Sequence, residues 1–436
     1  MKIRFLLIAS LVIAFTTRAQ SAFNYTVALE GIDVPGLPGL HSFAFAQHEG
    51  KWLIIGGRTD GLHARQPFNS FPEKGNNTII YVVDITKKIT YSASIASLPD
   101  GLRDQLQSGN MNFYQDGNTL YLVGGYAYSP GEKKHITYPF LTAVDVVSLT
   151  DAVQQGKPMN NCFSQIRDDL FAVAGGQLGK IGNVFYLVGG HRFDGRYNPM
   201  GHPSYRQQYT HAVRRFSVQK TSKGISFTAL ESWQDEQHLR RRDFNLLPMI
   251  MPDDQPGYLL SSGVFQENQD LPFLYPVIIT GKGYQPIIGF NQYLSNYHSA
   301  KISLYDKSTR QNHLLFFGGM SQHYLENGER VRDDLVPFVS TISVLTYYPD
   351  GSLKEIALPV SMPGFMGSSA EFILNRSVTH LSSEIIRLDA LKGNRVLLGH
   401  IAGGIQSQTP NPFSRNQTNT TRAVATVYAV YLLRRQ

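Results

Sequence analysis

The sequence predicts an all-β protein, a β-propeller of six blades closed by its N-terminal strand, and three observations support this. The 436 residues include 39 Gly, 23 Tyr and 25 Phe, which suits many short strands joined by tight turns. An apolar strand followed by a glycine pair recurs along the chain, and a Pro-Phe pair recurs downstream of it. Repeats of this kind are typical of blades arranged around a ring.

The glycine pair follows a continuous apolar run, such as Trp52–Ile55, in each unit. Such a run is typical of a strand buried on both faces between neighbouring blades. Glycine at the strand end permits a positive φ and close backbone approach. The six instances, of which the fourth is degenerate, end at Gly56-Gly57, Gly124-Gly125, Gly189-Gly190, Ser262-Gly263, Gly318-Gly319 and Gly403-Gly404.

A second phrase, Pro-Phe, follows after a long polar loop and precedes a further strand, because proline cannot donate to a β-ladder and suits a strand entrance. We expect such strands over 79–84 and 143–147, and outer strands over 89–93 and 225–229. The five Pro-Phe pairs are Pro67-Phe68, Pro139-Phe140, Pro272-Phe273, Pro337-Phe338 and Pro412-Phe413.

The last unit has no outer strand of its own, and the segment 25–29 can supply it. This pairing would close the ring and remove an exposed sheet edge. We therefore expect one propeller domain over 20–436. Its approximate blades are 41–109, 110–168, 169–238, 239–294, 295–364 and 365–436, the last completed by strand 25–29.

The N-terminus has the pattern of a secretory signal over residues 1–19: a basic start at Lys2 and Arg4, a short apolar run and a small-residue site at Ala19. We expect export to the periplasm or beyond, with no transmembrane segment after cleavage. Removal of this segment would lower the formal charge from +7 to +4. The remaining basic residues are scattered, which argues against nucleic-acid binding. Cys162 is the only cysteine, so an intramolecular disulfide is excluded.

The glycine-pair phrase, together with the His41-Ser42 opening of the first inner strand, resembles the kelch repeat, in the superfamily that includes the galactose oxidase propeller. The resemblance covers nearly the whole mature chain, although it lacks most of the distal Tyr and Trp of standard kelch units. It implies the propeller fold. It does not select a function, because kelch propellers serve as enzymes, carbohydrate binders and protein scaffolds.

The loops after the glycine pairs are long and rich in aromatic, basic and acidic side chains, which supply the stacking area and directional hydrogen bonds that sugar or peptide recognition needs. We predict a glycan or a cell-envelope or extracellular protein as the partner of this long-loop face, and no cofactor. The candidate ligand-binding residues are Arg58, Asp60, His63, Tyr126, His191, Arg192, Asp194, Arg196, His323 and Glu326.

Two sugar-active enzymes are the alternatives. Exported bacterial kelch propellers include sialic acid epimerases, and Glu326 or Asp194 with Arg192 or Arg58 could move a proton beside a bound anion.

The second alternative is a copper-radical oxidase, because Tyr297-His298 resembles the copper-binding pair of galactose oxidase-like enzymes, and His and Tyr suit Cu(II). It requires Cys162 to be crosslinked to a tyrosine and a further histidine ligand. The candidates for these two positions are Tyr205, Tyr209, His380 and His400.

Overall fold

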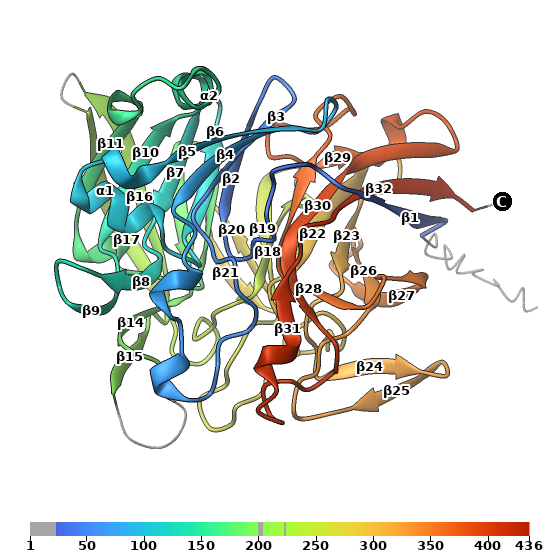
Figure 1. Cartoon of the computed structure of the whole chain (residues 1–436). Helices are drawn as coiled ribbons and strands as arrows, with labels where there is room; N and C mark the ends of the chain where they lie inside the picture. The colour runs from blue at the N-terminus through green and yellow to red at the C-terminus, as the bar shows by residue number, and fades with distance from the viewer. Residues whose placement is uncertain (1–22, 199–203, 222–223, 436) are drawn as a thin grey trace, which may run out of the picture.

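Six β-sheets stand in a ring in the computed structural model (Figure 1). The structure describes residues 23–198, 204–221 and 224–435. The chain passes once around the ring, so that the last blade, red in Figure 1, lies beside the first, blue blade. The predicted six-bladed propeller is therefore confirmed, whereas the predicted signal segment 1–19 lies outside the described residues.

The first three blades each contain four antiparallel strands. Blade 1 consists of β2 (Ala44–His48), β3 (Lys51–Ile55), β4 (Ile79–Asp84) and β5 (Ile89–Ser94). Blade 2 consists of β6 (Asn112–Asp116), β7 (Thr119–Val123), β10 (Phe140–Asp145) and β11 (Phe163–Arg167). Blade 3 consists of β12 (Gln177–Ile181), β13 (Val184–Val188), β16 (Ala212–Thr221) and β17 (Gly224–Gln234).

The other three blades repeat this order, and two of them gain a short strand. Blade 4 consists of β18 (Asn245–Ile250), β19 (Pro256–Ser261), β20 (Val277–Thr280) and β21 (Gly283–Pro286). Blade 5 consists of β22 (Ala300–Asp306), β23 (Gln311–Phe317), β26 (Thr341–Tyr347), β27 (Leu353–Ser361) and the added β29 (Ile386–Arg387). Blade 6 consists of β28 (Phe365–Leu374), β30 (Arg395–Ser407), β32 (Val427–Arg434), β1 (Tyr25–Ile32) and the added β31 (Thr421–Ala423).

The two ends of the ring differ in their connections. Turns and the β28–β30 loop occupy the end that we call the short-hairpin face, at the top of Figure 1. The long loops after the glycine pairs occupy the opposite end, the long-loop face. Three of these loops form hairpins: β8 (Tyr126–Ser129) with β9 (Lys134–Thr137), β14 (His191–Gly195) with β15 (Tyr205–Tyr209), and β24 (His323–Glu326) with β25 (Glu329–Arg332).

In the described part of the chain, two α-helices interrupt the strand pattern, α1 (Asp100–Leu106) and α2 (Val146–Gln155). The strand predicted over 143–147 is wrong at its end, because the chain turns into α2 after Asp145. The Asp145 carboxylate accepts a hydrogen bond from the backbone N–H of Ser148 at 2.9 Å, a cap that favours helix initiation. No helix in the described part of the chain is long and apolar enough to cross a membrane.

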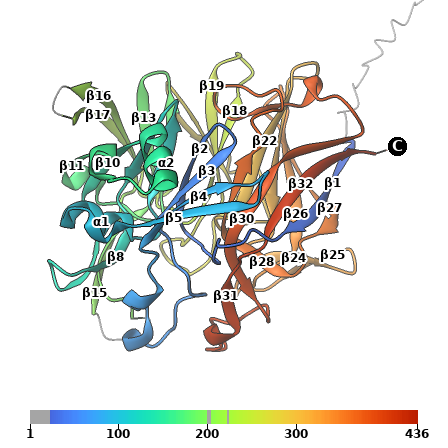
Figure 2. The same cartoon turned by 45° about the horizontal axis from the view of Figure 1, so that its top comes forward.

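The N-terminal strand closes the ring, as predicted. β1 pairs antiparallel with β32 from Tyr25 opposite Arg434 to Ile32 opposite Val427, and the two strands lie side by side in both views (Figures 1 and 2). Val27 is buried in the core of the last two blades. The closing contact thus joins segments about 400 residues apart and protects the edge of β32.

The glycine pairs have left-handed backbone; they directly follow the second strand in blades 1, 2, 3 and 5, and lie within β30 in blade 6. Gly56 and Gly57 have φ values of 69° and 83°, and a Cβ on Gly57 would lie 2.5 Å from the carbonyl oxygen of His41. In the degenerate fourth unit, Ser262 and Gly263 adopt φ values of 52° and 94°. The repeated phrase therefore encodes a tight backbone crossing next to the inner strand of the same blade.

A belt of six backbone hydrogen bonds encircles the axis at the start of the inner strands. One residue of each blade donates its N–H to the carbonyl oxygen of its counterpart in the preceding blade, and the N···O distances run from 2.7 to 3.4 Å. Blade 1 donates to blade 6, so the belt is closed. We call it the backbone ring; its members are Ser42, Asn110, Gly175, Asp243, His298 and Ser369.

Amide side chains also join neighbouring blades, two residues after the ring position. Asn112 donates to the carbonyl oxygen of Val173 in the next blade. Gln177 bonds the backbone of blade 4 in the same way, and Asn245 that of blade 5. These buried amides satisfy backbone groups between sheets, and so they stabilise the order of the blades.

Candidate functional site

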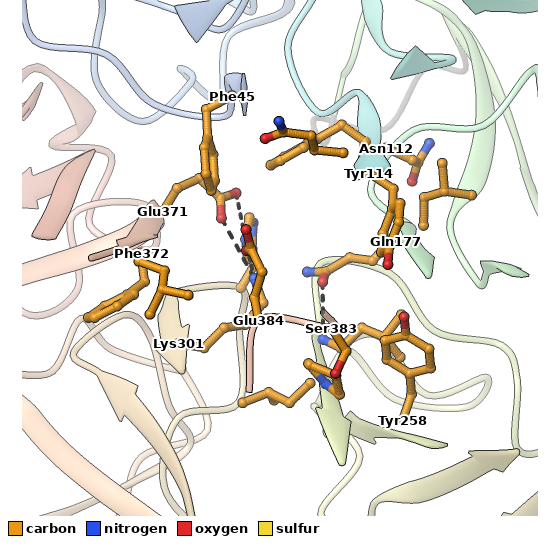
Figure 3. A pocket seen from close by; sticks show the side chains of 18 of the residues that line it. Phe45, Asn112, Tyr114, Gln177, Tyr258, Lys301, Glu371, Phe372, Ser383 and Glu384 are labelled. Atoms are coloured by element: carbon orange, nitrogen blue, oxygen red, sulfur yellow. Dashed lines mark hydrogen bonds and ion pairs between the residues drawn. The ribbon is translucent and has the colours of Figure 1, made fainter. Parts of the chain in front are cut away.

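A cavity of about 490 Å³ occupies the centre of the ring. It is lined by the inner strands of all six blades, and it runs from the backbone ring to the short-hairpin face, where the β6–β7 turn and the β28–β30 loop border it. Figure 3 shows side chains from opposite blades converging on it. Its size falls within the range of small-molecule sites.

Three ionisable side chains meet in the cavity wall near the backbone ring. Glu371 Oε1 lies 3.1 Å from His298 Nε2, and Glu371 Oε2 lies 3.7 Å from Lys301 Nζ. Lys301 Nζ and His298 Nε2 are 3.2 Å apart. We call these residues the channel cluster. Their side chains are only 7%, 18% and 14% exposed for Glu371, His298 and Lys301, so the charges lie in a largely desolvated place beside an open cavity.

Burial and charge act in opposite directions on this cluster. Burial tends to raise the pKa of Glu371, but the positive charge of Lys301 and the contact with His298 outweigh it, so the pKa is lowered. Burial also lowers the pKa of Lys301, and the attraction of Glu371 offsets this only in part. The result is an anionic carboxylate next to an amine that gives up its proton more readily than usual.

The channel cluster occupies positions where the repeat is broken. Glu371 lies two residues after the ring position, where blades 2, 3 and 4 carry the bridging amides. Lys301 lies three residues after the ring position of its own blade, His298, and the other five blades carry Phe or Leu at the corresponding position. A buried charge in place of an amide or an apolar side chain costs folding free energy. Its presence at two adjoining positions therefore indicates a role other than blade packing.

Aromatic and amide groups form the rest of the cavity wall. Phe45 and Phe372 lie on the same side as Glu371 in Figure 3, and Tyr114 lies across the cavity near Gln177. Tyr258 belongs to the same wall, and its hydroxyl oxygen lies 2.9 Å from the backbone nitrogen of Lys180, which donates to it. Flat apolar faces next to polar groups are suited to stacking and hydrogen bonding of a sugar ring.

Arg376 bridges three blades at the rim of the cavity. Its guanidinium donates to Glu384 Oε1 at 2.6 Å, to Gln115 Oε1 at 3.0 Å and to the carbonyl oxygen of Gln47 at 3.2 Å. Glu384 belongs to the β28–β30 loop and projects at the front of the cavity in Figure 3. This rim holds the loop next to the cavity mouth.

None of the ten sequence-predicted binding residues lines the cavity; all lie in the loops of the long-loop face. The structure brings several of them together. Arg58 donates through Nε to Asp60 Oδ1 at 2.9 Å and through Nη1 to Asn76 at 2.6 Å. Asp60 also lies 3.6 Å from His41 Nε2. Arg58 is 5% exposed, so most of its hydrogen-bonding capacity is used inside the protein.

An aromatic cluster around Phe71 holds two more of the predicted residues. The ring of His63 stacks on Phe71 with centroids 4.6 Å apart, and Tyr126 meets Phe71 edge-on at 5.4 Å. The hydroxyl of Tyr126 donates to the carbonyl oxygen of Gly195 at 2.7 Å. Burial lowers the pKa of His63 to about 4, so this imidazole is neutral at physiological pH.

The predicted residues of blade 3 lie on or beside the β14–β15 hairpin. Arg192 donates to Asp194 Oδ2 at 2.9 Å, and His191 Nδ1 lies 2.6 Å from the amide nitrogen of Gln207. Arg196 donates to the carbonyl oxygen of Phe68 in blade 1 at 3.3 Å. These contacts fasten one long loop to another.

The two predicted residues of blade 5 lie on the β24–β25 hairpin. His323 is buried and meets Tyr293 edge-on at 4.9 Å, whereas Glu326 is exposed at the end of β24. The predicted set thus divides into a network around Arg58 and Phe71, the blade 3 hairpin and the blade 5 hairpin.

The described residues do not fit a copper-radical centre. Cys162 is buried in the core between blades 1 and 2, while Tyr205 and Tyr209 belong to β15 on the long-loop face. His400 packs against Trp52. Within the described ranges, no three His, Cys, Asp or Glu side chains are grouped so that they could hold a metal ion.

Sequence reasoning missed Glu371 and Lys301, and it named His298 only as a copper ligand. The repeat itself does not reveal them, because the interval from the ring position to the glycine pair is 14 residues in blade 1 (Ser42 to Gly56) but 34 in blade 6 (Ser369 to Gly403), and only the structure aligns the inner strands. The comparisons with known proteins add no assignment, because no family model and no curated protein matches the chain.

Proposed function

We propose that the protein is an exported, kelch-like propeller that binds a small carbohydrate-class ligand in its central cavity. The observation that carries this proposal is the channel cluster, which places ionised groups beside a cavity lined by aromatic and amide side chains. The N-terminal pattern at Lys2 and Arg4 supports export.

The charge balance of the cavity favours a ligand with little net charge. Asp116 is paired with Lys180, Glu384 with Arg376, and Glu371 with Lys301. Polyhydroxy compounds use such fixed donors and acceptors without adding an unpaired charge, and their apolar ring faces stack on aromatic side chains. The resemblance to kelch proteins is consistent with this ligand class.

Titration calorimetry with a panel of neutral and acidic mono- and disaccharides tests the proposal. The decisive variant is the double substitution Glu371→Gln with Lys301→Leu, which puts in place side chains that other blades carry. The matched control is Arg58→Met on the long-loop face. For a sugar that binds the wild-type protein, we expect the affinity to fall at least about tenfold in the double variant and to stay unchanged in Arg58→Met. Absence of binding across the panel, or loss in the Arg58 variant alone, overturns the proposal.

A second candidate, a protein partner on the long-loop face, is favoured by exposed apolar side chains there. Phe68 is 71% exposed, Leu335 58% and Leu325 43%, and all three lie in loops after glycine pairs. Crosslinking of the protein in its own cell envelope, compared with a Phe68→Ser, Leu335→Ser variant, tests this. An unchanged crosslinking pattern contradicts it.

The channel cluster also favours the alternative of a sugar-active enzyme such as an epimerase-like isomerase. A carboxylate, an imidazole and an amine within 3.7 Å of one another can accept and return a proton. The test is deuterium incorporation from D₂O into a bound sugar, followed by NMR. Exchange that Glu371→Gln abolishes supports proton transfer, whereas a bound sugar that does not exchange limits the function to binding.

A further inference from the structure

Lys301 has a setting that ion pairing alone does not explain. It stands in an inner strand at a position that is apolar in the other five blades, and its side chain reaches the wall of the cavity. Its Nζ lies 3.2 Å from an imidazole nitrogen and 3.7 Å from a carboxylate oxygen. An ion pair on the protein surface would require neither the burial of Lys301 nor the neighbouring imidazole of His298.

The surroundings of Nζ suit a nucleophilic amine. Burial favours the neutral form of an amine, and the pKa of Lys301 is lowered in spite of its carboxylate neighbour. The neutral amine has a lone pair that can attack a carbonyl carbon. The cavity supplies room for a small carbonyl compound next to that nitrogen, and residues of the backbone ring line the same end of it.

We propose that Lys301 forms a reversible imine with the free aldehyde or ketone group of an open-chain sugar. This rests on the proposed function, because it assigns the reactive group of a ligand in the same cavity. His298 and Glu371 are the groups that handle the protons of this reaction.

The step is balanced without an oxidant or reductant. Glu371 takes a proton from the Lys301 ammonium, and the freed lone pair forms a C–N bond while the carbonyl π pair moves to oxygen. The nitrogen, now positively charged, passes one proton by way of His298 to that oxygen, which becomes the hydroxyl of a neutral carbinolamine. Glu371 then returns the proton that it took, so the hydroxyl leaves as water while the nitrogen lone pair forms the C=N bond. Amine plus carbonyl thus become protonated imine plus water.

Trapping with sodium cyanoborohydride tests the proposal on the whole protein. Glycolaldehyde represents the aldehyde of an open-chain aldose in one arm and hydroxyacetone the ketone of a ketose in the other, and modified lysines are mapped by peptide mass spectrometry. We expect Lys301 to be labelled at least about tenfold faster than Lys87 in the arm that matches the ligand, because the Lys87 side chain is 71% exposed and lies outside the cavity. The arm with the faster rate identifies the carbonyl class.

Two variants make the outcome decisive. Lys301→Arg keeps the positive charge beside Glu371 but cannot form the imine, so it should fold and lose only this label. Lys282→Arg, at an exposed lysine paired with Asp253 outside the cavity, is the matched control and should keep the label. Labelling of Lys301 no faster than of Lys87 in both arms overturns the inference. Sugar binding by calorimetry without such labelling overturns the imine while leaving the proposed function intact.

Discussion

The long-loop face and the central cavity use ionised side chains in different ways. On the long-loop face, Arg58 is held by Asp60 and Asn76, and its charge organises one loop. In the cavity wall, Glu371 and Lys301 form a largely desolvated ion pair with open space beside it. The difference shows that the charged and aromatic side chains of a loop can serve to hold the loop's own conformation and need not bind a ligand. A charge that interrupts a packing repeat is the more informative signal.

The largest expected effect is at the channel cluster. Glu371→Leu leaves the Lys301 ammonium buried without its counter-ion, and we expect the free energy of unfolding to fall by about 3–5 kcal/mol. The double variant Glu371→Gln with Lys301→Leu should recover most of this loss, because no unpaired charge remains. Urea denaturation followed by circular dichroism measures both. Equal losses in the single and double variants would contradict the assigned ion pair.

A smaller effect is expected at the matching pair on the long-loop face. Arg58→Met removes a buried guanidinium but leaves Asp60, whose side chain is 32% exposed and can be hydrated. We expect a loss of about 1–3 kcal/mol in the same urea assay. Sugar affinity in the cavity should stay unchanged. A loss as large as that of Glu371→Leu would remove the distinction between the two regions.

The pH dependence of stability should separate the regions further. The pKa of His63 is lowered to about 4 by burial, below its usual 6.5, so the unfolded state binds the proton more readily. Stability from this group is present above pH 6.5 and is lost as the pH falls from 6.5 toward 4. His63→Gln should flatten this part of a stability–pH curve by about 1 kcal/mol or more.

Glu371 should act in a different window. Its pKa is lowered, so its contribution is present above the usual value of 4.5 and is lost as the pH falls through the lower folded value. The His63→Gln variant should therefore still lose stability below pH 4.5. Chemical denaturation at a series of pH values measures both pH windows. The same pH dependence of stability in the wild-type protein and in His63→Gln would contradict the assignment of the higher window to His63.

The smallest effect on stability is expected at the exposed rim of the long-loop face. Phe68 is 71% exposed, so Phe68→Ser should change the free energy of unfolding by less than about 0.5 kcal/mol. Any effect should appear only in partner capture. A loss of sugar affinity in this variant would mean that the two faces are not independent.

The sequence by itself determined the ring of six blades and its closure, because these depend on periodic signals. The apolar runs and glycine pairs recur once per blade, in degenerate form in the fourth, and the absence of an outer strand in the last unit indicates where segment 25–29 pairs. The end of the strand over 143–147 was mistaken, since the capping carboxylate of Asp145 starts a helix there. Local chemistry outweighed the apolar run at that point.

Only the tertiary structure decided which polar residues adjoin the cavity. His298, Lys301 and Glu371 come from two blades, and nothing local marks them as neighbours until the inner strands are brought around one axis. Proximity across a ring depends on how far each strand extends past the backbone ring. That register is set by packing and interblade hydrogen bonds such as those of Gln177 and Asn245, which no single segment of sequence contains.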